Sequence, residues 1–592
     1  MPLLDMLRVK IHKYIFLLFI FYAFLTMINP VFAAKANIDI ELLADLPSED
    51  KQDIIDNLSL NQYKESPFAN KDYVDTLMHK GINEIQTMLQ AFGYFKSNVT
   101  VSSTKHGDKL LVKYNLDLGP PVIVSAVNIQ LAGAGKNDKE LDTWLKNFPL
   151  KKGDVLLQLK YEAAKKDILQ LLRSRGYFSS KLDAHEIAVN LNTMSADITM
   201  NIDTGPRYKF GKTSFIQKDY DEGYLHRFLN YKQGDYFDAT VIADLQKRLI
   251  KSQEFLSVEI NPEISSASDL EVPITIRLIP RKKWQFSFGG GYDSSSGPEV
   301  TALVNQRRFT RRGHQAGAQT SLSRLKKQVQ VYYQIPAKRP WSDNYNIAYD
   351  FTEEDTEDTS RYTNSVIAKY TRVFSSIQNI YSVTYDNERY VIGNELSDRA
   401  QVVVPSFAIQ YTPLDSAILN NLRLDLYTEL RGANTNLASD VDFTQTVSHG
   451  NLNYRFLNRW RVVSRFNVAF TDIADFEKLP VSYRFFAGGD YSVRGYKYNS
   501  LSPEDSQGNH VGGRNLLVGS VELRYRFLPQ WDTAIFYDVG NAYNTGNIDL
   551  KVGTGVGVGW IYSLLSVRLY AANAISLPDR PWRFSIILGA AL

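Results

Sequence analysis

From Trp284 onward, the chain consists of segments of about ten residues in which apolar and polar side chains alternate. A period of two places successive side chains on opposite faces of a strand. The clearest segment has apolar residues at Leu422, Leu424, Leu426 and Leu430 and charged residues at Arg423, Asp425, Glu429 and Arg431. A soluble antiparallel sheet also alternates, but the repeatedly charged face here favours a lipid-facing exterior and a wet lumen. About sixteen such segments occur, so the pattern predicts a transmembrane antiparallel β-barrel over residues 281–592.

The region before the barrel contains three copies of one sequence pattern. The Gly-Tyr-Phe steps that begin at Gly93 and Gly176 lie 83 residues apart, and the Gly-Asp steps at Gly153 and Gly234 lie 81 residues apart. In the third copy the Gly-Tyr step is absent, and Gln253 begins the corresponding sequence. The agreement of the spacings indicates a repeated domain of roughly 80 residues.

Each copy has the pattern strand, helix, helix, strand, strand. Within Tyr161–Leu172, the apolar residues Ala164, Ile168 and Leu172 share one helical face, and Ala196–Ile202 alternates as a strand does. This order predicts an α+β domain with its helices on one side of a small sheet. We assign the three α+β domains to residues 34–120, 121–205 and 206–280.

A small sheet of this kind leaves an edge strand exposed, and an extended peptide can add to that edge through backbone hydrogen bonds. We therefore expect the repeats to dock a partner or a client polypeptide. The alternative is that the repeats only hold the barrel at a distance from something else.

Residues 1–33 have the features of a secretory signal peptide. A basic flank precedes an apolar run over residues 14–28, and Val31-Phe32-Ala33 supplies a cleavage site. A retained membrane anchor is the alternative, but the run is short for a span. Because no later apolar stretch is long enough for a membrane helix, an exported chain of this kind enters a membrane only as a barrel. We expect the cell outer membrane of a Gram-negative bacterium, with the N-terminal domains in the periplasm.

Composition excludes several classes of function. The chain has no cysteine, which excludes disulfides, cysteine-ligated zinc and thiol catalysis. Its formal net charge is only +3, which gives no reason to expect a nucleic-acid partner. The eight histidines are scattered without metal-ligand spacing, and no Gly-x-Ser-x-Gly turn is present. We therefore expect no enzymatic activity, no metal and no cofactor.

One connection within the barrel region, over residues 473–514, is much longer than the others. Connections of this length are usually functional or disordered, and its glycine-rich, aromatic first half is not typical of a disordered tip. We expect this segment to fold back into the lumen, because a barrel of about sixteen strands is too wide for wall side chains to fill. We call it the lumen loop. Its first half carries Gly488, Gly489, Val493, Arg494, Gly495 and Tyr496.

The strands after the lumen loop offer partners for Arg494. Their alternation places Glu522 and Asp538 on the inner face of neighbouring strands, where two carboxylates could bind one guanidinium. Solvated lumen charges, as in a porin, are the alternative. Glycines at 553, 555, 557 and 559 recur with a period of two and without a following helix, which excludes a phosphate-binding loop. We expect all four to face the lumen and to make room for the packed loop.

These motifs resemble those of a known superfamily. Phe486-Ala487-Gly488-Gly489 followed by Val493-Arg494-Gly495-Tyr496 is similar to the lumen-loop motif of the Omp85 superfamily, and Glu522 and Phe536–Gly540 match its downstream strand motifs. The repeats resemble the polypeptide-transport-associated (POTRA) domains of that superfamily. The resemblance covers nearly the whole mature chain, and it implies that Arg494 packs against Glu522 or Asp538 of the barrel wall.

The number of repeats suggests a branch. Three repeats and a barrel of this size resemble the TamA-type branch, whereas BamA-type assembly factors carry five repeats and two-partner secretion transporters carry two. The resemblance implies a TamB-like partner anchored in the inner membrane, outer-membrane or autotransporter-type client proteins, and contact with the lipid bilayer. One departure is the C-terminus, which ends in Leu592 where assembly signals often have an aromatic residue.

We hypothesise that the barrel acts at the seam between its first and last strands. Gly289, Gly290 and Gly291 in the first strand and Gly589 in the last would give poor cross-strand side-chain pairs. A weak seam could open laterally so that a client strand pairs with an exposed edge. The alternatives are a two-partner-type transporter that passes one exoprotein through the lumen, and a BamA-like assembly factor. Whether the task is protein insertion or phospholipid movement stays open at this point.

Overall fold

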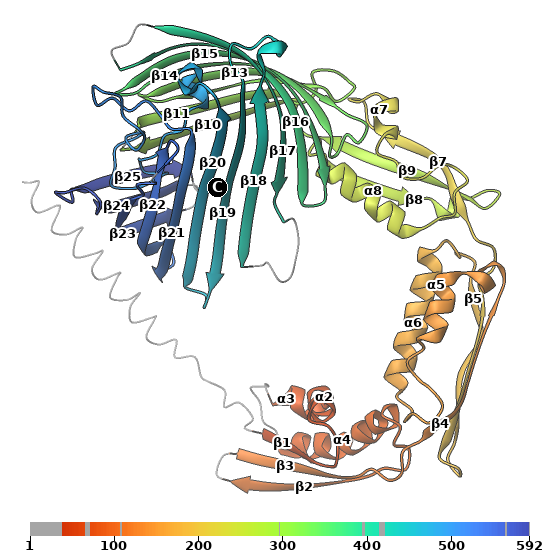
Figure 1. Cartoon of the computed structure of the whole chain (residues 1–592). Coiled ribbons are helices and arrows are strands. Elements are labelled where there is room, and N and C mark those ends of the chain that lie inside the picture. The colour runs from red at the N-terminus through yellow and green to blue at the C-terminus, as the bar shows by residue number, and fades with distance from the viewer. Residues whose placement is uncertain are drawn as a thin grey trace, which may run out of the picture. The chain divides into compact units, whose positions relative to one another are not determined.

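The computed structural model describes residues 38–64, 71–106, 109–294, 296–393, 397–413, 421–546, 548–562 and 565–590. These residues form three small α+β domains, each with a three-stranded sheet, followed by a closed barrel of sixteen strands (Figure 1). The predicted fold class is therefore confirmed. The predicted signal peptide, residues 1–33, lies outside the described residues. Within the described part of the chain, no helix combines the length and the apolar character needed to span a membrane.

The first domain contains a three-stranded sheet in the order β1-β3-β2, with β1 parallel to β3. Its core is formed by apolar residues of the helices and of all three strands, among them Ile54, Leu89 and Val112. A third helix makes this copy longer than the predicted pattern. The elements are β1 (Ile38–Leu43), α2 (Ser48–Asn57), α3 (Ser59–Tyr63), α4 (Lys71–Ala91), β2 (Asn98–His106) and β3 (Lys109–Asp117).

The second domain has the predicted order of strand, two helices and two strands, and its sheet has the order β4-β6-β5. The face of α6 predicted from its apolar residues is buried, with Ile168 and Leu172 fully covered. The helix ends before Gly176, whose φ of +85° is a left-handed conformation that glycine adopts without strain. The elements are β4 (Ile123–Ala132), α5 (Lys139–Lys146), α6 (Gln158–Ser174), β5 (Lys181–Asn190) and β6 (Ser195–Asp203).

The third domain repeats this arrangement with the sheet order β7-β9-β8. At the end of its long helix, Gln253 takes the left-handed conformation, φ +58°, that glycine supplies at Gly93 and Gly176. The loss of the glycine in this copy therefore left the turn itself in place. The elements are β7 (Lys209–Ile216), α7 (Glu222–His226), α8 (Ala239–Lys251), β8 (Phe255–Pro262) and β9 (Glu271–Pro280).

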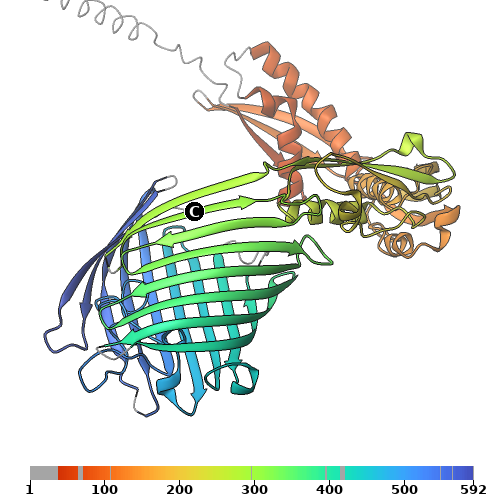
Figure 2. The ribbon, with the colours of Figure 1, turned by 90° about the horizontal axis from the view of Figure 1, so that it is seen from above.

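Sixteen strands, β10 to β25, form the barrel, and each pairs with its neighbour in sequence (Figure 2). Alternation along the strands separates the two faces: Val521 and Ile535 are 52% and 59% exposed, whereas Glu522 and Asp538 are 3% and 0% exposed. The strands are β10 (Trp284–Asp293), β11 (Gly297–Gln306), β12 (Gln315–Leu322), β13 (Lys326–Pro336), β14 (Asn344–Asp355), β15 (Thr359–Phe374), β16 (Ile377–Ile392), β17 (Asp398–Tyr411), β18 (Leu422–Ala433), β19 (Phe443–Phe456), β20 (Trp460–Ile473), β21 (Asn515–Leu528), β22 (Trp531–Tyr543), β23 (Lys551–Tyr562), β24 (Leu565–Ala574) and β25 (Trp582–Ala590).

Helix α7 of the third domain contacts two turns of the barrel. The Tyr224 ring lies against Gly313 in the turn between β11 and β12. The Arg227 guanidinium donates to the backbone carbonyl of Pro336 at 3.0 Å and to that of Ala337, at the end of β13. These turns mark the end of the barrel that adjoins the third domain, and the lumen loop leaves from the opposite end.

Candidate functional site: the lumen loop and the barrel seam

The lumen loop begins after β20 and ends before β21, over residues 474–514. Two short 3-10 turns, η5 (Phe476–Lys478) and η6 (Val481–Tyr483), start it. Its apolar residues Ala487, Val493 and Leu501 are buried in one cluster with Val518 and Ala574 of the barrel wall. The segment is therefore packed against the wall, as expected for a loop that folds into the lumen.

Arg494 is the centre of a buried ionic contact between the loop and the wall, and it is only 1% exposed. Its Nε and Nη2 donate to the two carboxylate oxygens of Asp538 at 2.7 and 2.8 Å, and its Nη1 donates to Glu522 Oε2 at 2.6 Å. The backbone N–H of Arg494 also donates to Asp538, at 3.0 Å. A planar guanidinium with five donors fits two carboxylates at once, which a lysine ammonium does not.

Two aromatic rings complete the environment of the guanidinium. Its central carbon lies 3.6 Å from the ring centre of Phe536 and 4.8 Å from that of Tyr570. The Tyr570 hydroxyl donates to Glu522 Oε1 at 3.1 Å, and Arg524 Nε donates to the same oxygen at 2.6 Å. Each charge in this cluster is therefore paired and hydrogen-bonded, which is the condition under which buried ions are tolerated. We call these contacts the Arg494 anchor.

The other predicted loop residues shape the backbone around this anchor. Gly488, Gly489 and Gly495 all have φ between +96° and +99°, a region that strongly favours glycine. Gly495 also lies against the backbone of β24, where an added Cβ would come 3.1 Å from Ala574 N. The Tyr496 hydroxyl donates to the Val552 carbonyl of β23 at 3.1 Å.

At the four alternating glycines of β23, different neighbouring atoms occupy the space that a side chain would need. Only Gly553 lies against the lumen loop, where an added Cβ would meet the Arg494 carbonyl. Gly555 lies against the Ala571 backbone carbonyl and the Phe536 ring, and Gly557 lies against the Tyr570 ring, where an added Cβ would come within 2.6 Å. Gly559 lies beside Asp532 and Arg568. The expectation that all four clear space for the loop is thus wrong for three of them, because atoms of the barrel wall fill the space at those positions.

Sequence reasoning missed a second set of contacts, between the loop and strands β14 and β16. The Tyr483 hydroxyl donates to Asp386, and the Ser482 backbone N–H donates to Glu388 at 3.1 Å. The Tyr498 hydroxyl donates to Glu354 at 3.1 Å. We call these contacts the Tyr483 anchor. The alternation of β16 places both of its carboxylates inward and was a readable signal, but nothing in the sequence pattern assigns their partners.

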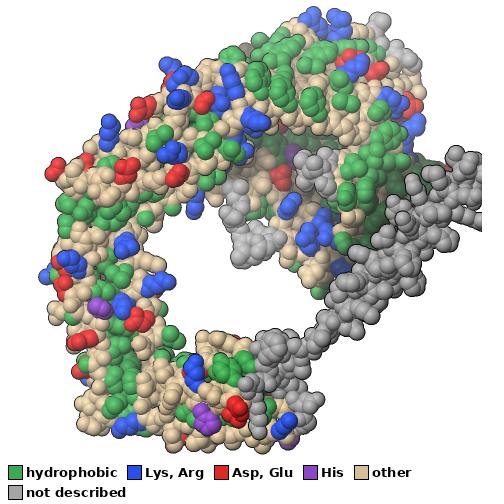
Figure 3. All heavy atoms as spheres, turned by 180° about the vertical axis from the view of Figure 1, so that it is seen from behind, with side chains coloured by type: hydrophobic (Ala, Val, Ile, Leu, Met, Phe, Trp, Pro, Cys, Tyr) green, Lys and Arg blue, Asp and Glu red, His purple; other side chains and the backbone are tan. Residues whose placement is uncertain are grey.

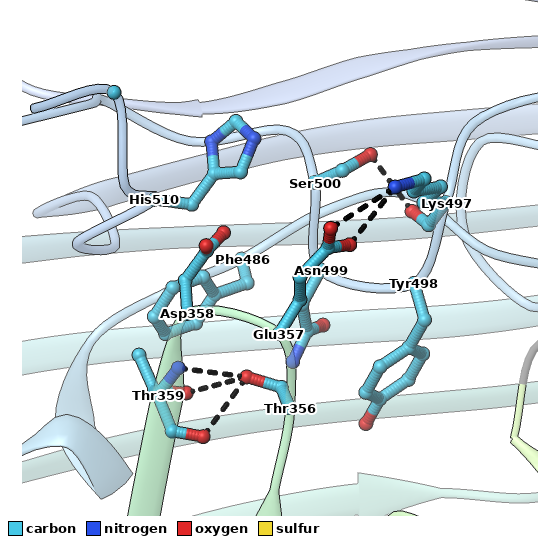
Figure 4. Close-up of a pocket in the computed structure, with 11 residues that line it drawn as sticks. Thr356, Glu357, Asp358, Thr359, Phe486, Lys497, Tyr498, Asn499, Ser500 and His510 are labelled. Carbon is cyan, nitrogen blue, oxygen red and sulfur yellow. Dashed lines mark hydrogen bonds and ion pairs between the residues drawn. The ribbon is translucent and has the colours of Figure 1, made fainter. Parts of the chain in front are cut away.

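A polar pocket of about 160 Å³ lies between the lumen loop and the turn that joins β14 to β15 (Figure 4). Lys497 of the loop donates to both carboxylate oxygens of Glu357 in this turn, at 2.9 and 3.2 Å. Both side chains are mostly exposed, so this ion pair adds little stability. Within the described ranges, no three carboxylate or histidine side chains are grouped as a metal site would require.

The seam between β10 and β25 has few backbone pairs. Among the residues that the structure describes, two of β10 pair with β25: Tyr292 with Leu588 and Asp293 with Ile587. The same two strands form ten and nine pairs with their other neighbours, β11 and β24. Backbone pairing at the seam is therefore much less extensive than at the adjoining strand pairs.

Of the four predicted seam glycines, only one is required by a close approach across the seam. A Cβ on Gly291 would come 2.6 Å from the Leu588 carbonyl. Gly289 instead faces Thr301 of β11, and at Gly290 and Gly589 the nearest atoms lie 3.8 Å away, where a methyl group fits. The seam glycines thus do not act as one set.

Comparisons with known proteins agree with this architecture. The Omp85 superfamily domain matches residues 309–589, and a POTRA family described as a surface antigen variable number repeat matches residues 122–205. The outer membrane protein assembly factor BamA of Nitratidesulfovibrio vulgaris is 21% identical over 354 residues, which are 56% of this chain and 44% of that protein. This chain therefore spans less than half the length of that relative.

A solved structure shares the fold. BamA from Haemophilus ducreyi lacking POTRA domains 1–3 superposes with a TM-score of 0.66 at 18% identity and covers 79% of this chain and 99% of its own. CdiB from Acinetobacter baumannii gives a TM-score of 0.48 at 15% identity, covering 80% of this chain and 90% of its own. A barrel of this type behind POTRA domains lies in the outer membrane, with the N-terminal domains in the periplasm. The chain thus carries an Omp85 superfamily domain at residues 309–589, behind a POTRA domain at residues 122–205.

Proposed function

We propose that this protein is a non-enzymatic insertion and translocation factor of the outer membrane, which works by lateral opening of its seam. The observation that carries the proposal is the pairing of β10 with β25 at two of the described residues of β10. An unpaired strand edge offers backbone donors and acceptors to another chain. In a membrane such an edge is costly unless a partner strand satisfies it.

The side chains at the seam support the same proposal. Phe288 of β10 and Phe584 of β25 are 80% and 75% exposed on the outer face, and so present apolar surface to lipid. A client strand paired with the edge of β10 would already have its apolar side chains at the height of the bilayer. Release into lipid would then need no passage of polar backbone through the hydrocarbon core.

The clients we propose are outer-membrane proteins, including those of autotransporter type. The relative from N. vulgaris is an outer membrane protein assembly factor, which is consistent with such clients. The three-repeat architecture favours the TamA-type branch over the BamA-like one. We therefore propose a TamB-like protein, anchored in the inner membrane, as the partner that the periplasmic repeats dock through an edge strand such as β2, β5 or β8.

A two-partner-type secretion transporter is the alternative. In that case the client crosses the lumen, so the lumen loop has to leave its place. The Arg494 anchor opposes such a movement, because withdrawal of the guanidinium leaves Glu522 and Asp538 buried without their cation. This contact favours a route at the seam over a route through the lumen.

A reversible lock of the seam tests the proposal. Tyr292 and Leu588 are directly opposed, so Tyr292→Cys with Leu588→Cys can form a disulfide across the seam in a chain that has no native cysteine. The matched control carries Thr301→Cys with Ser321→Cys. These two residues are opposed in the paired wall between β11 and β12. Client assembly is measured in cells that depend on the variant, with and without a membrane-permeable reductant.

The seam lock is expected to stop client assembly until it is reduced, while the control lock leaves assembly unchanged. Full assembly by an oxidised seam lock would contradict lateral opening. A second measurement addresses the partner: crosslinking from residues of β2, β5 and β8 in native envelopes, followed by mass spectrometry. Recovery of one large protein anchored in the inner membrane supports the TamB-like partner, and recovery of only a secreted protein favours the two-partner alternative.

A further inference from the structure

The inner face of the barrel carries a group of arginines at its periplasmic end. Basic side chains gather on the inner wall of the barrel in Figure 3. Five arginines and Asp532 line one shallow recess there, on strands β19 to β22 and the turn between β19 and β20. We call this group the arginine patch. It consists of Arg455, Arg459, Arg461, Arg524 and Arg526.

Strand register brings these positive charges close together. Arg461 is directly opposed to Arg455 on one side and to Arg524 on the other. The backbone N–H of Arg526 donates to the Arg459 carbonyl at 2.8 Å, so these two arginines are also adjacent. Like charges directly opposed on neighbouring strands destabilise a sheet. The patch therefore has an unfavourable electrostatic energy that an anion would relieve.

The negative charges near the patch are already used. Asp532 accepts from Arg568 at 3.1 and 3.2 Å, and Glu522 accepts from Arg524 at 2.6 Å. Within the described part of the chain, the side chains of Arg455, Arg459, Arg461 and Arg526 form neither an ion pair nor a hydrogen bond, and Arg461 interacts with Asp532 only at longer range. Four guanidinium groups thus share one recess whose described carboxylate, Asp532, is already bound by Arg568.

Position favours a polypeptide over a lipid as the source of the anion. On β21 the outward residues Val521 and Phe527 are 52% and 44% exposed, whereas Arg524 and Arg526 lie on the opposite, lumen-facing side. The lumen loop contacts the wall closer to the other end, at Glu522 and Asp538. A chain that enters the lumen from the periplasm therefore reaches the patch before it reaches the loop.

We propose that the arginine patch binds the carboxylates of an acidic polypeptide segment that enters the lumen from the periplasm. An arginine guanidinium can bind a carboxylate with two parallel hydrogen bonds. Four guanidinium groups without an ion-pair partner therefore fit a segment with several acidic residues. This inference rests on the proposed function, since it supplies a client contact for the same barrel.

The patch also touches the Arg494 anchor. One carboxylate, Glu522, accepts from Arg524 of the patch through Oε1 and from Arg494 of the loop through Oε2, both at 2.6 Å. An acidic segment that recruits Arg524 removes one donor from Glu522. Occupancy of the patch is therefore linked to the loop contact through a single side chain.

Binding of a defined probe to the purified full chain in detergent tests the proposal. The probe is a fluorescently labelled deca-glutamate peptide, followed by fluorescence anisotropy. The patch variant carries R455Q, R459Q, R461Q and R526Q, which spares Arg524 and the anchor. The matched control carries R324Q, K326Q, R389Q and R399Q, which removes the same charge near the other end of the barrel. Circular dichroism and heat-dependent gel mobility verify that both variants are folded.

We expect the wild type and the control to bind the probe, with an affinity that falls as salt rises, and the patch variant to bind it at least about tenfold more weakly. Equal binding by the patch variant overturns the proposal. Competition by inorganic phosphate or by dihexanoyl-phosphatidylglycerol at lower concentrations than free deca-glutamate also overturns it, because the site then prefers phosphate. Since no client assembly is measured, failure here leaves the outcome of the seam lock unaffected.

Discussion

Glu254 accepts a hydrogen bond from the Tyr224 hydroxyl at 2.7 Å in the core of the third domain. Both side chains are buried, at 3% exposure each. In the second domain the roles are exchanged: Tyr177, which stands after the long helix as Glu254 does, donates to Asp138 before the short helix. The same packing position thus holds the acid in one repeat and the phenol in the other.

Glu254→Gln is expected to remove a pH dependence of the third domain. Burial raises the pKa of Glu254 to about 7, from an ordinary value of 4.5, although the Tyr224 hydrogen bond acts against this rise. The folded state therefore keeps a proton that the unfolded state releases near pH 4.5. The stability that this proton contributes is complete below that pH and is lost as the pH rises through about 7, by at most roughly 3 kcal/mol.

Thermal unfolding of the periplasmic region of the full chain, followed between pH 5 and pH 8, measures this effect. The wild type should lose stability across that range relative to the Glu254→Gln variant, whose residue 254 does not titrate. Asp138→Asn in the second domain provides a comparison in which the pH dependence of stability has the opposite sign. Although burial opposes ionisation of Asp138, hydrogen bonds from Arg175 and Tyr177 lower its pKa, so its contribution is present at neutral pH and is lost in acid. Parallel pH curves for the wild type and Glu254→Gln would contradict the assignment.

Arg494→Ala is expected to free the lumen loop. The substitution leaves two buried carboxylates without their cation, a change that costs about 3–5 kcal/mol in buried ion pairs. Arg494→Lys should give an intermediate effect, because an ammonium cannot bind both carboxylates with parallel hydrogen bonds.

Conductance of single molecules in planar bilayers measures this release, as more frequent and larger open events. Lys497→Ala is the matched control in the same loop, because the Lys497–Glu357 pair is largely exposed and contributes little. If Arg494→Ala and Lys497→Ala gave the same traces, the Arg494 anchor would not hold the loop in place.

The alternation of strands predicts both the barrel and the inward positions of Glu522 and Asp538, since a period of two fixes the face of every residue once the lipid side is identified. The role of Arg494 could be assigned only with the superfamily resemblance, because two solvated carboxylates would give the same pattern. The repeat spacing likewise predicts the three α+β domains, and it places Glu254 at the position of Tyr177.

The Tyr483 anchor could not be predicted in the same way. Tyr483 and Asp386 are 97 residues apart, and the path of an irregular loop follows no period that sequence reasoning can use. The interpretation of the β23 glycines was incomplete for a related reason. Gly557 faces the Tyr570 ring, and rotamers of rings on neighbouring strands are not encoded in the alternation.

Tyr483→Phe is expected to loosen the loop on the side of β16 by removing the hydrogen bond to Asp386. A buried carboxylate that loses a donor costs roughly 1–3 kcal/mol. Hydrogen exchange of the backbone amides in residues 481–486 should therefore accelerate, while Tyr381→Phe, on an outward position of the same strand, should leave these amides unchanged. In an Asp386→Asn background the effect of Tyr483→Phe should shrink, and an undiminished effect would show that Asp386 is not its partner.

Gly553→Ala is expected to displace the lumen loop from β23. The new Cβ would meet the Arg494 carbonyl, and insertion of one methyl group into a packed contact of this kind costs about 1–3 kcal/mol. Gly519→Ala is the matched control on β21, because its Cβ finds Val539 Cγ1 at an ordinary 3.8 Å. Conductance and hydrogen exchange of residues 493–496 should change in the first variant and not in the second. In an Arg494→Ala background, where the loop is already released, Gly553→Ala should add little; a full additional effect would place the strain within the wall and not at the contact between the loop and β23.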